Sequence, residues 1–128
     1  MTRELGAADS RAACPCCGLR TLDPRGEYEI CAVCWWEDDG QDNDEADSVS
    51  GGANAHLSLT QARVNVLQHG ISNPSRVDLV KMRKPVEQFV RDREFSMSAD
   101  GSAVLESGTL WQSRAFTADG PRGRRTRG

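Results

Sequence analysis

Four of the five cysteines form two Cys-x-x-Cys pairs near the start of the chain. The pairs are Cys14 with Cys17 and Cys31 with Cys34, and thirteen residues separate them. A Cys-x-x-Cys turn directs both thiols toward one point, so two such pairs can supply four thiolates to a single tetrahedral ion, most often Zn²⁺. The spacing therefore predicts a metal centre with these four cysteines as its ligands.

Three kinds of site compete for these cysteines. A site closed by four cysteines is usually a structural zinc site, and this is the interpretation that we favour. Iron bound as in rubredoxin is the alternative, because thiolates also suit iron. Disulfides are disfavoured, because the chain shows no export signal and reducing compartments keep thiols reduced. With no export signal and no apolar run long enough to span a membrane, we expect a cytoplasmic protein.

The remaining cysteine, Cys16, lies inside the first pair. Cys16 and Cys17 are adjacent and cannot easily both reach one ion, so we expect Cys16 to be a plain thiol beside the site. A reactive thiol is the alternative, although adjacency to a metal ligand does not by itself lower the pKa of a thiol.

The segment between the pairs predicts a β-hairpin. Arg20–Leu22 and Tyr28–Ile30 are short and β-compatible, and the sequence DPRG at positions 23–26 is a strong turn signal. Gly18 follows the first pair and allows the open backbone of a zinc knuckle, whereas Trp35 stands at the matching place after the second pair. The prediction is a small α+β fold built on a zinc-ribbon hairpin.

Ser58 begins the clearest helix of the chain. Ser58 as N-cap and Gln61 at N3 fit a capping box. Apolar residues follow at helical spacing, and Gly70 is placed to end the helix. A helix over residues 58–69, packed against the metal-binding hairpin, is therefore expected.

Weaker patterns follow this helix. Short helices are expected to begin at Asn73 and to run over Pro85–Arg93. After that the composition changes to Ser, Gly, Ala and Asp with isolated apolar residues, and the chain closes on an arginine-rich stretch. We expect a disordered lead over 1–13, a zinc-ribbon-like domain over 14–94, and a loosely ordered appendage with a basic tail over 95–128.

Charge is divided unevenly along the chain. The net charge is −3, but residues 14–60 hold ten acids against two bases, and residues 61–128 hold twelve Lys and Arg against seven acids. The acidic half should repel a phosphate backbone, which disfavours binding to nucleic acid. The basic half could fold back against the acidic one, and the C-terminal arginines keep a nucleic-acid-binding zinc ribbon as an alternative.

The densest run of carboxylates lies at Glu37–Glu45. It lacks the glycine and the bidentate Glu of an EF-hand loop, so a solvated acidic loop is expected rather than a second metal site.

Several short motifs occur together: CPCCG at 14–18, YxICxVCxWEDD at 28–39, GGAN at 51–54 and SLxxARxN at 58–65. In this combination the chain resembles the cysteine-rich CPCC family of small bacterial proteins. The resemblance covers about residues 14–70 and implies a zinc-ribbon-like domain with a helix packed beside it. It suggests one polar cluster of Trp36–Asp39, Asn54, Arg63 and Asn65, and it implies no activity.

Three classes of function follow. An enzyme needs an open metal site or a nucleophile with its base, and four cysteines close the metal. The histidines, His56 and His69, are not placed beside Cys16 by anything in the sequence. Catalysis by the polar cluster or by Cys16 is therefore the less favoured alternative. We favour a zinc-stabilised protein-interaction module with an acidic surface. Its expected partner is a protein with a basic surface.

Overall fold

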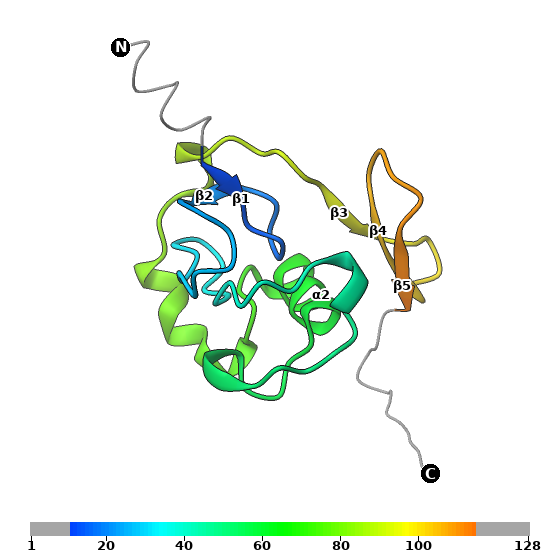
Figure 1. Cartoon of the computed structure of the whole chain (residues 1–128), viewed down its shortest axis with the longest axis horizontal. Coiled ribbons are helices and arrows are strands. Elements are labelled where there is room, and N and C mark those ends of the chain that lie inside the picture. Colours follow the sequence, from blue (N-terminus) through cyan, green and yellow to red (C-terminus); the bar gives the residue numbers. More distant parts are fainter. Residues whose placement is uncertain (1–10, 115–128) are drawn as a thin grey trace.

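The structure, a computed structural model, describes residues 11–114 and combines helix with two small antiparallel sheets (Figure 1). The elements in order are β1 Ala12–Ala13, β2 Arg20–Leu22, η1 Asn43–Glu45, η2 Gly52–Asn54, α2 Leu59–His69, η3 Pro74–Met82, η4 Val86–Gln88, β3 Phe95–Met97, β4 Ala103–Glu106 and β5 Gln112–Arg114, where η marks a 3₁₀ helix. The predicted α+β class is confirmed. None of the helices in this part of the chain has the length and apolar content needed to cross a membrane.

Each cysteine pair lies in the turn of its own short ladder, and the predicted hairpin between the pairs is not formed. Around the first pair, β1 pairs antiparallel with β2. Around the second, the Tyr28 amide donates to the Asp38 carbonyl at 2.9 Å, and the Asp38 amide donates to the Glu29 carbonyl at 2.9 Å. The knuckles themselves bring their flanks together: the Cys14 amide donates to the Leu19 carbonyl at 2.8 Å, and the Cys31 amide donates to the Trp36 carbonyl at 2.9 Å.

Helix α2 forms as predicted. Ser58 caps it, its Oγ accepting from the Gln61 amide at 3.0 Å, and Gly70 ends it in the left-handed conformation with φ 80°. The capping box is half formed, because the Gln61 side chain donates to Asn65 Oδ1 at 3.1 Å instead of returning to the cap. The first half of the helix is buried on several sides, since it lies between the cysteine-rich lobe and the sheet β3–β4–β5 (Figure 1).

Residues 95–114, expected to be a loose appendage, form an antiparallel sheet in the order β3–β4–β5 that packs on α2. Phe95 and Val104 are buried and form one apolar cluster with Val64 of the helix. The division expected at residue 95 therefore cuts through packed structure. The sequence signal was weak because β3 and β4 each have only one buried apolar side chain, Phe95 and Val104, and β5 has no apolar residue. The basic tail and residues 1–10 of the expected lead lie outside the described residues.

The region between α2 and the sheet is less helical than expected. Asn73 caps η3, its Oδ1 accepting from the Ser75 amide at 3.0 Å, so a helix does begin there, but it is a 3₁₀ helix. The predicted helix over Pro85–Arg93 is wrong beyond the single turn of η4. Phe89 is extended instead, and the carbonyl of Val90 accepts from the Arg20 amide at 2.8 Å. The exposed edge of β2 thus takes this segment as a partner, which overrides a weak local helical preference.

Candidate metal centre

The four cysteines of the two pairs converge on one point. Their Sγ atoms all lie within 4.8 Å of one another. The Cys14 and Cys34 sulfurs are 3.6 Å apart, and the Cys17 and Cys31 sulfurs are 3.8 Å apart. A tetrahedral ion with metal–sulfur bonds of about 2.3 Å holds its ligands roughly 3.8 Å from each other. The cluster therefore has the size and composition to hold one metal ion.

The two knuckles share one backbone geometry. The Gly18 amide donates to the Cys14 carbonyl at 2.8 Å, and the Trp35 amide donates to the Cys31 carbonyl at 3.0 Å. Gly18 has φ 86°, and Trp35, at the matching position, has φ 69°. Positive φ is unfavourable for a residue with a Cβ atom. The indole Nε1 of Trp35 donates to the Leu79 carbonyl at 3.2 Å, which helps to hold that conformation. The second knuckle therefore keeps the same backbone geometry although Trp35 stands where the first knuckle has Gly18.

Gly18 also allows a close approach that the sequence did not indicate. Its carbonyl accepts from the amides of Asp92 and Arg93 at 2.9 and 3.1 Å. A Cβ placed on Gly18 would lie 1.9 Å from the Arg93 carbonyl oxygen. The first knuckle is therefore packed directly against the chain that leads into β3.

Several donors point at the sulfurs. The amides of Val33 and Cys34 donate to Cys31 Sγ at 3.4 Å, and the Cys16 amide donates to Cys14 Sγ at 3.4 Å. The hydroxyl of Thr21 donates to Cys31 Sγ at 3.2 Å. Thr21 was not predicted as a site residue. The only sequence feature that distinguishes it is its position two residues before the DPRG turn signal.

The electrostatics of the cluster call for a cation. Hydrogen bonds from the neighbouring thiols, that of Cys14 first, lower the pKa of Cys31 far below its ordinary value. Burial raises the pKa of Cys14 and of Cys34 well above the ordinary value. Several thiolates cannot share one buried point without a positive charge among them, and a metal ion supplies that charge.

Cys16 is buried but lies outside the group of four. Its side chain lines a pocket next to Cys17. His56 and His69, the histidines considered as its catalytic partners, are both exposed. The plain-thiol interpretation of Cys16 stays a prediction.

Arg63 of α2 is completely buried and ties three parts of the molecule together. Its Nε donates to the Pro15 carbonyl at 2.7 Å, inside the first knuckle. Its guanidinium carbon lies 4.1 Å from the Phe95 ring centre and 4.7 Å from that of Trp111. Burial lowers the pKa of Arg63 to about 10. Arg63 also forms an ion pair with the acidic run, since its Nη2 is 3.6 Å from Asp42 Oδ1.

Asp42 is the centre of an ion-pair network and not part of a solvated loop. Its carboxylate accepts from Arg25 Nη1 at 2.7 Å and from Arg93 Nη2 at 2.8 Å. Partial burial alone would raise the pKa of Asp42, but the bonds from Arg93 and Arg25 outweigh it and lower the pKa to about 2. Arg93 Nε also donates to Glu106 Oε2 at 2.8 Å. Because Arg93 belongs to the basic half and Asp42 to the acidic one, their ion pair shows that the basic half does fold back onto the acidic half.

The structure brings together only part of the expected polar cluster. Asn54 bonds both backbone groups of Glu37 at 2.9 Å, so these two members do meet. Asn65 Nδ2 donates instead to the Ser72 carbonyl at 2.8 Å, and Asp38 accepts from the Gly26 amide at 2.6 Å. Each of these side chains therefore holds a segment of backbone.

A comparison with protein-family models finds a match to the family described as cysteine-rich CPCC, over residues 12–88. Comparisons with curated proteins and with solved structures find no match.

Proposed function

The chain belongs to the cysteine-rich CPCC family, and we propose that it is a zinc-stabilised module that binds a protein partner through an acidic, partly apolar loop. The observation that carries this proposal is the exposure of Tyr28 and Ile30 among carboxylates, on a loop whose two ends are fixed by the cysteine cluster.

Zinc fits the cysteine cluster best as a structural ion. Four cysteine ligands complete a tetrahedral shell, which leaves no position for water or substrate. Structural zinc can contribute an apparent ~10–16 kcal/mol to folding of small domains at neutral pH. The ion would join the two knuckles, which the ladder hydrogen bonds leave as separate units.

The loop over residues 23–30, here called the Tyr28 loop, is suited to contact a partner. Tyr28 is 63% exposed and Ile30 is 44% exposed, with Glu27 and Glu29 on either side of Tyr28. Tyr28 has φ 62°, a strained conformation for a side chain of this size. Exposed tyrosines frequently anchor protein interfaces, and strain of this kind clusters at functional positions.

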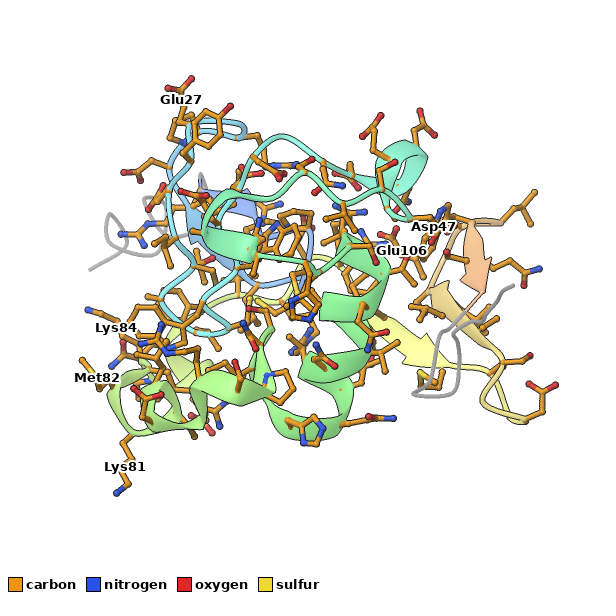
Figure 2. All side chains as sticks on the ribbon, turned by 90° about the horizontal axis from the view of Figure 1, so that it is seen from below. Glu27, Asp47, Lys81, Met82, Lys84 and Glu106 are labelled. Carbon is orange, nitrogen blue, oxygen red and sulfur yellow. The ribbon has the colours of Figure 1, made fainter. Side chains whose placement is uncertain are left out.

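The fold holds the Tyr28 loop rigidly. The loop lies between Cys17 and Cys31, and the buried carboxylate of Asp38 accepts from Arg25 Nε at 2.9 Å at its turn. Glu27 lies at the edge of the molecule opposite Lys81 and Lys84 (Figure 2). Preorganisation lowers the entropy cost of binding, and the carboxylates favour a partner with a basic surface.

Metal content is the first test. Zinc in a one-to-one ratio with the chain, in protein purified without oxygen, supports the structural role. Iron with a coloured thiolate spectrum would instead indicate an electron carrier, the alternative that thiolates also allow.

Site-specific crosslinking tests the interaction. A photo-crosslinking amino acid replaces Tyr28 in the full chain inside cells, and the matched control carries it at Val49, which is 56% exposed. We expect one protein to crosslink from position 28 and not from 49, and Glu27→Lys with Glu29→Lys to abolish it. Binding of the purified pair should weaken as salt rises. Equal crosslinking from both positions, or binding insensitive to salt and charge reversal, contradicts the proposal.

A further inference from the structure

A pocket of about 330 Å³ lies beside the cysteine cluster, with Cys16 and Cys17 in its lining. Its apolar lining comes from the first knuckle, the second knuckle, α2, η4 and β3, and consists of Leu19, Val33, Val66, Leu67, Val86 and Phe95. This volume is at the lower end of the range for small-molecule sites, which are typically about 300–1,000 Å³ and mostly apolar with few polar groups. Leu67 and Val86 are each more than a third exposed, so the apolar lining reaches the surface.

Two arginines supply the charge of this pocket. Arg83 Nη1 donates to the Gly70 carbonyl at 2.7 Å, and Arg91 Nη1 donates to the Cys17 carbonyl at 2.7 Å. These bonds hold both guanidinium groups at the pocket while leaving further N–H donors on each.

The two arginines differ from the others in the described chain. Between residues 11 and 113, each of the other arginines has a carboxylate oxygen within 4.0 Å. Arg83 and Arg91 have no such partner among the described residues, and the pocket lining contains no Asp or Glu. Within residues 11–114, two cations without a carboxylate partner therefore flank one apolar pocket.

We propose that this pocket binds a small organic carboxylate whose apolar part lies on Leu67 and Phe95 and whose carboxylate is held by Arg83 and Arg91. A guanidinium fork matches a carboxylate in two-point hydrogen bonding. A phosphate would match the fork as well, but a second negative charge costs more to desolvate in an apolar pocket. The proposal is independent of the role of the Tyr28 loop.

An NMR titration of the zinc-loaded full chain tests this assignment. The probe is 3-phenylpropanoate, and its neutral amide and inorganic phosphate are the matched controls. We expect saturable shifts of the amides of Leu67, Gly70 and Phe95 with the carboxylate, and neither control should reproduce them at the same concentration. The absence of saturable shifts at millimolar carboxylate overturns the proposal, and so does equal binding of the neutral amide.

Two kinds of variant locate the binding site. Arg83→Gln and Arg91→Gln should each weaken binding roughly tenfold or more, as expected for loss of a charge-assisted bond. Arg76→Gln, a matched control on the exposed side of η3, should not change it. Leu67→Trp keeps both arginines and their carbonyl bonds while filling the pocket, and should abolish binding with zinc content unchanged. Equal weakening by Arg76→Gln, or full binding by Leu67→Trp, would show that the carboxylate binds elsewhere.

Discussion

Replacing Asp42 by asparagine removes the negative charge at the centre of three arginines and leaves the shape of the side chain nearly unchanged. Asparagine is also a good N-cap, so the cap of η1, where Asp42 Oδ1 accepts from the Asn43 amide at 2.8 Å, should persist. The substitution therefore isolates the charge of the network from its geometry.

The size of the effect follows from the pKa of Asp42. That pKa is about 2 instead of 3.8, because the hydrogen bonds from Arg93 and Arg25 outweigh partial burial. A difference of this size corresponds to roughly 2.5 kcal/mol, and it must be reduced for screening because the side chain is 35% exposed. Arg63, fully buried, also loses its carboxylate. We expect Asp42→Asn to lower the free energy of unfolding by about 2 kcal/mol.

Urea denaturation of the zinc-loaded protein, followed by circular dichroism at neutral pH and low salt, measures this loss. Urea is preferable to guanidinium because it does not screen ion pairs. Asp44→Asn, an exposed neighbour, is the matched control and should change the free energy of unfolding by less than about 0.5 kcal/mol. If Asp42→Asn and Asp44→Asn have equal small effects, the network does not stabilise the fold and our reasoning fails.

The stability difference between the wild type and Asp42→Asn should also depend on pH, in a defined direction. The pKa of Asp42 is lower in the folded than in the unfolded state, so its contribution is complete above the ordinary value near 4 and is lost as the pH falls toward 2. The stability difference between the wild type and Asp42→Asn should shrink over that window. A difference that stays constant or grows with acidification would contradict the assignment.

Three further predictions concern the metal centre and the C-terminal sheet. Gly18→Ala should destabilise the fold by more than about 3 kcal/mol, because its Cβ would collide with the Arg93 carbonyl. Gly108→Ala, at a similar φ but in open space, should cost only about 1 kcal/mol, and thermal denaturation compares the two variants. Removing the metal ion from the metal-loaded protein with a strong chelator should abolish cooperative unfolding, and adding the ion back should restore it; a cooperative metal-free protein would show that the ion is dispensable. Deleting residues 95–128 should destabilise the fold strongly, whereas deleting residues 115–128 leaves the sheet whole and should not; equal stability of the two deletions would mean that the sheet is an independent appendage.

The local features of this protein could be read from its sequence. The spacing of the cysteines within each pair sets how the knuckle turns, so the cluster of four was predictable before any tertiary contact was known. Helix α2 was equally predictable, because Ser58 and Gly70 act within one turn of the ends that they define. The family resemblance rested on the same short motifs.

The features that only the tertiary structure decided depend on segments far apart in the chain. The arginine at position 63 gives no local sign that it will be buried between Pro15, Phe95 and Trp111. The pairing of Val90 with Arg20 likewise replaced an expected helix, because the free edge of β2 offers hydrogen bonds that a weak local preference cannot match.

The same distinction applies to charge. The sequence shows that the first half is acidic and the second half basic, but net charge says nothing about which groups meet. Folding places Arg93 on Asp42, whereas Arg83 and Arg91 have no carboxylate partner within residues 11–114. The cysteine spacing therefore predicted the group of four thiols, whereas long-range packing decided which charges in this part of the chain are paired.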